Sequence, residues 1–159
     1  MRRQEPVPES IAPETFIASA ALECMTDVQL GRLAMDRGGA ESLRHFAHAM
    51  LDVYEKGTAD IARIAARKGL PIPDSLDAEH QQFVERMREK SGPDFDLAYT
   101  GGIIERHQNA ITLFKRGQRI KDPEISALAS RTLNMLEARH RKTNLLRESI
   151  ATEPQSASP

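Results

Sequence analysis

One histidine interrupts an apolar stripe in the stretch GGIIERHQNAITLF, residues 101–114. At helical spacing His107 falls between Ile103 and Phe114, so its imidazole is expected to face a protein core. A buried imidazole can bind a metal through a ring nitrogen, or it can form hydrogen bonds with other buried polar groups. We expect a core histidine with hydrogen-bond partners, and metal binding is the alternative.

Further polar residues fall on or near the inward faces of the predicted helices: Asp27, Tyr54, Arg139 and, at the border of its stripe, His140. A cation beside a buried aspartate more often forms an ion pair than a metal site, because it repels a metal and an unpaired buried carboxylate is costly. We therefore predict a structural polar network in which Asp27, Tyr54 or Arg139 binds His107. The alternative is a site for iron or another divalent metal, formed by His107, Asp27, Tyr54 and His140.

Helical periodicity and Gly/Pro punctuation position these residues on five helices. The predicted helices cover residues 13–37, 40–68, 77–90, 93–116 and 122–148. Long amphipathic helices joined mostly by tight loops predict an all-α antiparallel four-helix bundle over residues 13–149, and the short third helix is expected to lie across it as a connector. Composition predicts disorder in residues 1–12 and 150–159. A helical solenoid is less favoured, because the helices lack a common repeat.

Composition and charge exclude several classes of function. The 159 residues are enough for one domain, and 22 basic residues balance 23 acidic ones. Without a block of like charge, nucleic acid is not an expected partner. No apolar run approaches the roughly 18 residues of a membrane span, and no signal peptide is readable, so a cytoplasmic location is expected.

Five blocks of the sequence occur in a recognisable order: MTDVQLGRLA at 25–34, FAHAMLD at 46–52, Ala98-Tyr99, HQNAITLF at 107–114 and Thr132-Leu133. Together they resemble a bacterial ferritin-like family of unknown function, DUF4142, whose members are often labelled predicted outer-membrane or exported proteins. The resemblance covers residues 14–146. It implies a ferritin-like antiparallel four-helix bundle with a short connecting helix. It also implies a periplasmic or envelope location.

The resemblance also implies where histidines are typical. The family carries one in the second helix, where this chain has Tyr54, one at His107, and one in the last helix, at Arg139 with His140 one residue later. A ferritin-like di-iron site needs inward glutamates and Glu-x-x-His pairs. Glu137 and His140 have that spacing, but helical geometry places Glu137 on an outer face.

Other carboxylates fail the same geometric test. Glu55 and Glu105 fall on outer faces and Glu23 on an edge, so a carboxylate-rich di-iron centre is not expected. Antiparallel pairing about a loop near residue 120 brings His107 level with Leu133, and His140 on the order of 10 Å further along. We expect this displacement to prevent the two histidines from binding one metal.

The remaining reactive residue types indicate no chemistry. Cys24 is the single cysteine, so it cannot form an intramolecular disulfide, and it reads as a small buried hydrophobe. We expect His45, His48 and His80 to be solvated. No phosphate-binding loop, HExxH pair or nucleophile elbow is present.

These patterns favour a non-enzymatic bundle that acts through binding or assembly, with an unknown protein partner or by self-association, and without a cofactor. A stress-related role is suggested only by fold analogy. The alternative is a metal-binding or metal-oxidising protein that uses His107 with Asp27 and Tyr54.

Overall fold

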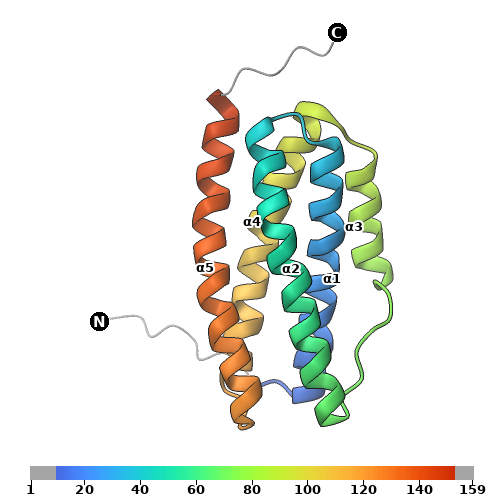
Figure 1. The fold of residues 1–159 in the computed structure, drawn as a ribbon, viewed down its shortest axis with the longest axis vertical. Helices are drawn as coiled ribbons and strands as arrows, with labels where there is room; N and C mark the ends of the chain where they lie inside the picture. Colours follow the sequence, from blue (N-terminus) through green and yellow to red (C-terminus); the bar gives the residue numbers. More distant parts are fainter. Residues whose placement is uncertain (1–9, 153–159) are drawn as a thin grey trace, which may run out of the picture.

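A computed structural model describes residues 10–152, which form five α-helices (Figure 1). They are α1 (Pro13–Arg37), α2 (Glu41–Lys68), α3 (Ala78–Arg88), α4 (Gly92–Gly117) and α5 (Pro123–Thr152). In this part of the chain the only bridge of β type is an isolated one between Gly38 and Gly92. The prediction of an all-α helical bundle is confirmed.

The ends of the bundle differ slightly from the prediction. Helix α5 continues to Thr152, and Ile150 near its end is 7% exposed. Burial of that side chain stabilises one further turn of helix. The prediction that disorder begins at residue 150 is therefore wrong for residues 150–152. Ile11 packs against the core ahead of α1, so order also begins before residue 13. Residues 1–9 and 153–159, the rest of the two predicted tails, lie outside the described residues.

Local sequence signals determine where the helices begin and end. The Asp77 side chain accepts a hydrogen bond from the backbone N–H of His80 and caps α3, at 2.9 Å. Asp122 caps α5 in the same way through the N–H groups of Glu124 and Ile125. Gly69 ends α2 in the left-handed conformation, with φ at 65°, which glycine adopts without steric cost.

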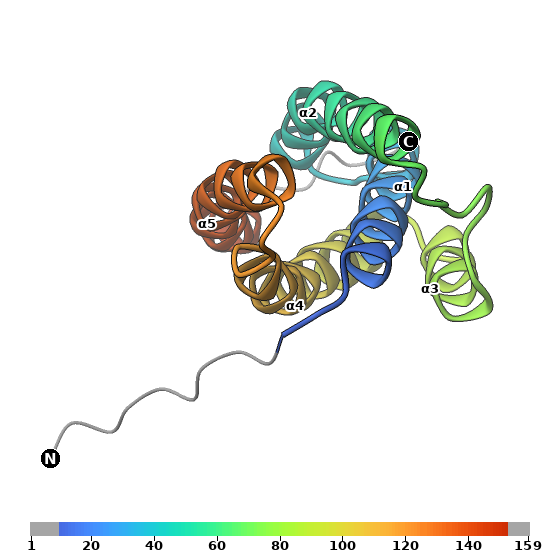
Figure 2. The same ribbon diagram turned by 90° about the horizontal axis from the view of Figure 1, so that it is seen from below.

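The four long helices surround one core, and α3 lies outside them (Figure 2). Helices α1 and α2 form one hairpin, α4 and α5 form the other, and α1 adjoins α4 while α2 adjoins α5. Chain direction runs up in α1, down in α2, down in α4 and up in α5 (Figure 1). Every adjoining pair is therefore antiparallel. Helix α3 runs alongside α1 and does not lie across the bundle, so that part of the prediction is wrong.

A close approach between α3 and α4 explains this placement. A Cβ atom on Gly102 would lie 2.9 Å from the Phe83 ring of α3, which only a glycine accommodates without a shift. Phe83 packs in turn against the apolar cluster at that end of the bundle. Gly102 therefore allows the close approach of α3 and α4.

The core consists of two apolar clusters, one toward each end of the bundle. One gathers Phe16, Ile61, Ile64, Phe114 and Ile125, and the other gathers Leu30, Leu43, Phe95, Tyr99 and Ile103. Between them, along every long helix, come the polar positions 27, 54, 107 and 139. The inward-facing polar residues therefore form a belt at mid-height of an otherwise apolar core.

One buried carboxylate joins the two hairpins. Asp96 of α4 is fully buried and accepts hydrogen bonds from the N–H groups of Gly39 and Ala40, each at 2.8 Å. These donors precede α2, whose N-cap residue Ala40 offers no side-chain cap. The carboxylate thus stabilises the positive end of the α2 dipole from another helix.

Among residues 10–152, none of the helices combines the length and apolar character that crossing a bilayer requires.

Candidate functional site

The predicted inward-facing residues do meet inside the bundle. Tyr54 of α2 and His107 of α4 are each 2% exposed, and Arg139 of α5 is 9% exposed. The charges of Asp27, Arg139 and His140 all act on the pKa of His107, as expected for neighbouring groups. We call Asp27, Tyr54, Tyr99, Arg106, His107, Arg139 and His140 the polar belt.

Within the belt, Asp27 is paired with Arg106 and not with His107. The Asp27 carboxylate accepts from the Nη2 and Nε atoms of Arg106 at 2.9 and 3.3 Å. Arg106 also forms an ion pair with Glu23 at 2.8 Å. Burial alone would lower the pKa of the guanidinium, but the Asp27 and Glu23 charges outweigh it and raise that pKa. A single cation from α4 therefore pairs with two carboxylates of α1, of which Glu23 is also contacted by His80.

Sequence reasoning missed Arg106, which stands next to His107 at the edge of the apolar stripe. An arginine at such an edge can lay its stem on the apolar surface and turn its head toward a neighbouring helix. The partially buried side chain, 13% exposed, does this toward α1. The signal that could have identified it is the presence of two acids, Glu23 and Asp27, one helical turn apart on the facing edge.

His107 is buried as predicted, but nothing binds it. Neither Nδ1 nor Nε2 has a hydrogen-bond partner among the described residues. The prediction that Asp27, Tyr54 or Arg139 binds this ring is wrong. Asp27 is ion-paired with Arg106, and Arg139 stacks on Tyr54. Burial, with the nearby Arg139 charge, lowers the pKa of His107 to about 4, so the ring is neutral at pH 7.

His140 lies against His107, contrary to the predicted displacement. The two ring centroids are 6.1 Å apart in an edge-to-face arrangement, and Nδ1 of His140 also lacks a partner within residues 10–152. Side chains tilt toward the N-terminus of their own helix. In antiparallel helices this tilt brings His107 and His140 toward each other. The rings are therefore closer than the displacement along the helix axis that the residue numbers predict.

Arg139 and Tyr54 form the other contact of the belt. The guanidinium carbon of Arg139 lies 4.9 Å from the centre of the Tyr54 ring, a cation–π contact. The Tyr54 and Tyr99 hydroxyls are buried, and neither has a hydrogen-bond partner in the described part of the chain. Burial and the Asp27 charge raise the pKa of Tyr54, so its hydroxyl remains protonated.

A cavity of about 310 Å³ opens beside this contact, between α2 and α5. Its polar end carries Asp27, Tyr54 and Arg139, and its apolar end carries Ile61, Phe114 and Leu128. From Leu128 to Arg139 the cavity follows α5 for roughly 16 Å at 1.5 Å per residue. We call it the α2–α5 cavity.

The histidine on the short helix is not solvated as predicted. The His80 imidazole lies between Asp77, 2.6 Å from Nδ1, and Glu23, 3.2 Å from Nε2. Its side chain is 18% exposed because α3 packs against α1. Burial lowers the pKa of His80, but the hydrogen bonds to Asp77 and Glu23 outweigh this effect and raise it. His45 and His48 are exposed, as predicted.

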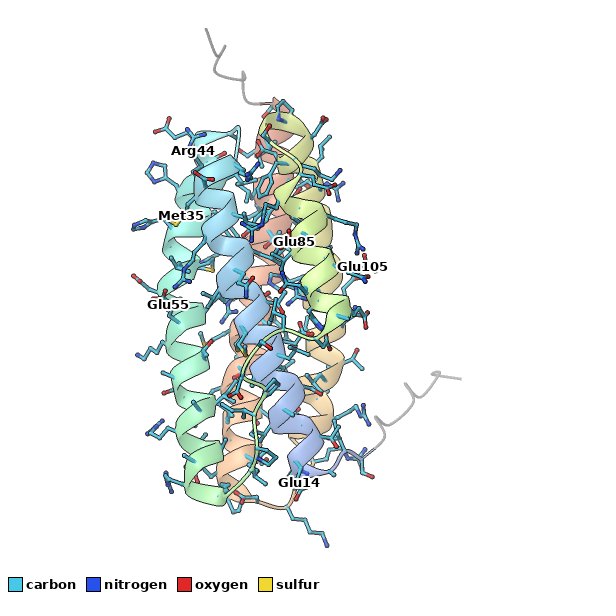
Figure 3. All side chains as sticks on the ribbon, turned by 90° about the vertical axis from the view of Figure 1, so that its right-hand side faces the viewer. Glu14, Met35, Arg44, Glu55, Glu85 and Glu105 are labelled. Atoms are coloured by element: carbon cyan, nitrogen blue, oxygen red, sulfur yellow. The ribbon has the colours of Figure 1, made fainter. Side chains whose placement is uncertain are left out.

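The glutamates lie where helical geometry placed them. Glu55 and Glu105 are on the outside of the bundle, as Figure 3 shows, and Glu137 is exposed as well. Across residues 10–152, no three His, Cys, Asp or Glu side chains are grouped in a way that could hold a metal ion. Of the alternative set, His107 and His140 are adjacent, whereas Asp27 is bound to Arg106.

Cys24 lines the same cavity. Burial, with the Asp27 charge, raises the pKa of its thiol to about 12, so the reactive thiolate is negligible at pH 7.

A family model described as a domain of unknown function, DUF4142, matches residues 2–146. The chain belongs to the DUF4142 family. The match spans nearly the whole described bundle, so the polar belt and the α2–α5 cavity both lie within the DUF4142 region. No curated protein and no solved structure was found to match the chain.

Proposed function

We propose that this DUF4142 protein is a non-enzymatic binding protein whose site is the α2–α5 cavity. The observation that carries the proposal is a cavity of about 310 Å³ whose lining includes Tyr54, a residue whose buried hydroxyl has no hydrogen-bond partner within residues 10–152. Ligand pockets are mostly apolar, with few polar groups, and begin at about 300 Å³. A buried polar atom without a partner costs free energy that a ligand can recover.

The chemistry of the lining supports binding over catalysis. The Cys24 thiol is protonated at pH 7, and within residues 10–152 it has no basic hydrogen-bond partner to activate it. His107 is neutral, yet neither ring nitrogen contacts a group that could become a nucleophile. Cys24 and His107 therefore contribute shape and polarity and are not set up to catalyse a reaction.

A matched pair of substitutions at Gly57 tests the proposal. Gly57 lines the cavity, and a Cβ atom there would make an ordinary contact with Cys24 Sγ at 3.6 Å. Gly57→Ala should leave the cavity open, whereas Gly57→Leu should fill it. We expect Nile red, a neutral apolar dye, to fluoresce with the wild type and Gly57→Ala and not with Gly57→Leu. Equal fluorescence with a folded Gly57→Leu variant would show that the dye binds elsewhere.

Metal binding is a second candidate, supported by the unpaired nitrogens of His107 and His140. Imidazole nitrogens are suitable ligands for a divalent transition metal, and the long crossover between hairpins is typical of ferritin-like folds. The other members of the predicted set fit a metal poorly, because Asp27 is ion-paired, Tyr54 is protonated and the Arg139 cation is adjacent. Water or a ligand would have to complete such a site.

Metal content of the purified protein tests this candidate after incubation with iron(II) or zinc and gel filtration. Stoichiometric metal in the wild type and in His48→Gln, but not in His107→Gln or His140→Gln, would support it. His48 is exposed on α2 and serves as the control. Absence of bound metal from the wild type would eliminate the candidate. A stress-related role and assembly with a protein partner or a second copy remain expectations from the fold and family.

A further inference from the structure

The acidic and basic residues that line the α2–α5 cavity form no ion pairs with one another among residues 10–152. Its acidic residues Glu23 and Asp27 are paired with Arg106, and Asp60 is paired with Arg63 at 3.2 Å. Neither arginine lines the cavity. The three acidic side chains therefore pair with cations outside the lining, but Arg106 alone serves both Glu23 and Asp27, and the Asp27 charge still acts on Tyr54 and Cys24.

The cations that line the cavity have no such compensation. Within residues 10–152, no ion pair joins Lys56, Arg131 or Arg139 to a carboxylate. Lys56 and Arg131 are exposed at the rim, where water solvates them, but Arg139 is buried. A buried guanidinium that stacks on an aromatic ring and has no carboxylate in ion-pair contact is incompletely compensated.

A hydrogen-bond donor accompanies this cation. The Tyr54 hydroxyl lacks a partner and belongs to a ring 2% exposed, and Arg139 stacks on that ring. Arg139 and Tyr54 therefore present donors at the same end of the cavity. Guanidinium donors match the geometry of a carboxylate, and such charge-assisted hydrogen bonds are stronger than neutral ones.

The other end of the cavity suits an apolar chain. Ile61, Ala110, Phe114, Leu128 and Leu136 line it without a charge among them. The cavity follows α5 for roughly 16 Å, which is long enough for an extended chain.

We propose that the α2–α5 cavity binds a free single-chain carboxylic acid, with the carboxylate on Arg139 and Tyr54 and the chain directed toward Phe114 and Leu128. The inference rests on the proposed function, of which it names the ligand class. The bound head group offsets the Arg139 charge, and the chain excludes water from the apolar end.

Three ligands with one chain length and different head groups test the proposal by calorimetry at pH 7: octanoate, octan-1-ol and octylamine. We expect octanoate to bind most tightly and octylammonium least. Arg139→Gln should weaken the binding of octanoate by about tenfold or more, since it removes a charged hydrogen-bond donor. The affinity for octan-1-ol should not change. Arg141→Gln, exposed on α5 and outside the cavity lining, is the control and should change octanoate binding less than about twofold.

Two further variants keep the test independent of folding defects. Arg139→Lys retains the charge and should retain the preference for octanoate over octan-1-ol. Tyr54→Phe retains the ring on which Arg139 stacks, and it should weaken the binding of octanoate but not of the other two ligands. Both are compared with the wild type by circular dichroism.

The possible failures are distinguishable. Octan-1-ol binding as tightly as octanoate to the wild type would overturn the carboxylate assignment and leave the cavity as a binding site. Failure of all three ligands and of Nile red would overturn the proposed function itself. Retention of phosphatidylglycerol vesicles without any binding of free octanoate would show that an anionic membrane surface, and not a free acid, is the ligand.

Discussion

Both ring nitrogens of His107 lie in the core, and within residues 10–152 neither forms the hydrogen bond that a buried imidazole nitrogen ordinarily has. An unsatisfied buried polar group costs about 1–3 kcal/mol. Asp27 would be the natural acceptor, but its ion pair with Arg106 is the stronger interaction. The side chains of the polar belt compete for hydrogen-bond partners, and His107 remains without one among the described residues.

Replacing His107 with leucine should therefore raise stability. Leucine fills a similar volume without polar atoms, so we expect a gain of about 1 kcal/mol in the free energy of unfolding. His107→Ala removes the same polar atoms but leaves a cavity, and should lie at least about 2 kcal/mol below His107→Leu. Urea titration of both variants gives these values. A less stable His107→Leu would mean that the imidazole has a partner, such as an ordered water.

The lowered pKa of His107 predicts a pH dependence. Its pKa of about 4 in the folded protein lies below the ordinary histidine value of 6.5, so between these pH values the unfolded chain binds a proton that the folded protein does not. Stability should therefore fall as pH decreases from about 6.5 to 4, by on the order of 3 kcal/mol in total. His80 opposes this, because its pKa is raised and its contribution grows as pH falls.

His107→Gln should flatten that profile. Unfolding free energies at pH 7 and pH 5 compare the variant with the wild type, and His48→Gln serves as the exposed control. The same loss of stability in His107→Gln would assign the pH dependence to other groups.

A few close contacts position the individual helices, and helix propensity does not predict these contacts. Gly117, the last residue of α4, is buried, and a Cβ atom there would overlap the Phe16 ring of α1. Phe16 in turn packs edge-to-face on Phe114, with ring centroids 5.3 Å apart. Gly57 of α2 has ordinary contact distances around it instead.

One substitution at these two glycines should have opposite effects. Gly57→Ala should stabilise the protein by up to about 1 kcal/mol, because alanine is the better helix former. Gly117→Ala should destabilise it by about 1–3 kcal/mol, because displacement of Phe16 outweighs the same propensity gain. Thermal unfolding of both variants provides the comparison. A shift of both melting temperatures in one direction would contradict the assigned contact with Phe16.

For the whole molecule, the two apolar clusters provide the core and the polar belt separates them. The clusters draw side chains from all four long helices, so the bundle can fold without a ligand at its centre. Ion pairs of Lys68 with Asp122 and Glu124, at 2.7 and 3.2 Å, join α2 to α5 at one end. The seam between these helices opens into the α2–α5 cavity further along.

We expect the helical content of the protein to be independent of metal. Circular dichroism at 222 nm before and after treatment with a chelator should give the same spectrum, and the melting temperature should not change. A protein that needed an ion at His107 and His140 to fold would lose helix on chelation. That loss would favour the metal-binding candidate over the α2–α5 cavity.

Periodicity and capping residues determined the helices and their inward faces, because both signals are local. Asp77, Gly69 and Asp122 act within one turn of the helix ends that they mark. The stripes placed Tyr54, His107 and Arg139 inside, since an angle of about 100° per residue accumulates little error over a few turns. These features could be predicted from the sequence.

The tertiary structure alone decided which polar groups meet. Hydrogen bonds depend on distances near 3 Å, whereas a change of one residue in register moves a helix by about 1.5 Å and rotates its side chains. Asp27 could reach His107 or Arg106 within that uncertainty, and His80 could face water or Glu23. The α2–α5 cavity likewise depends on side-chain volumes from four helices, which no single stretch of sequence contains.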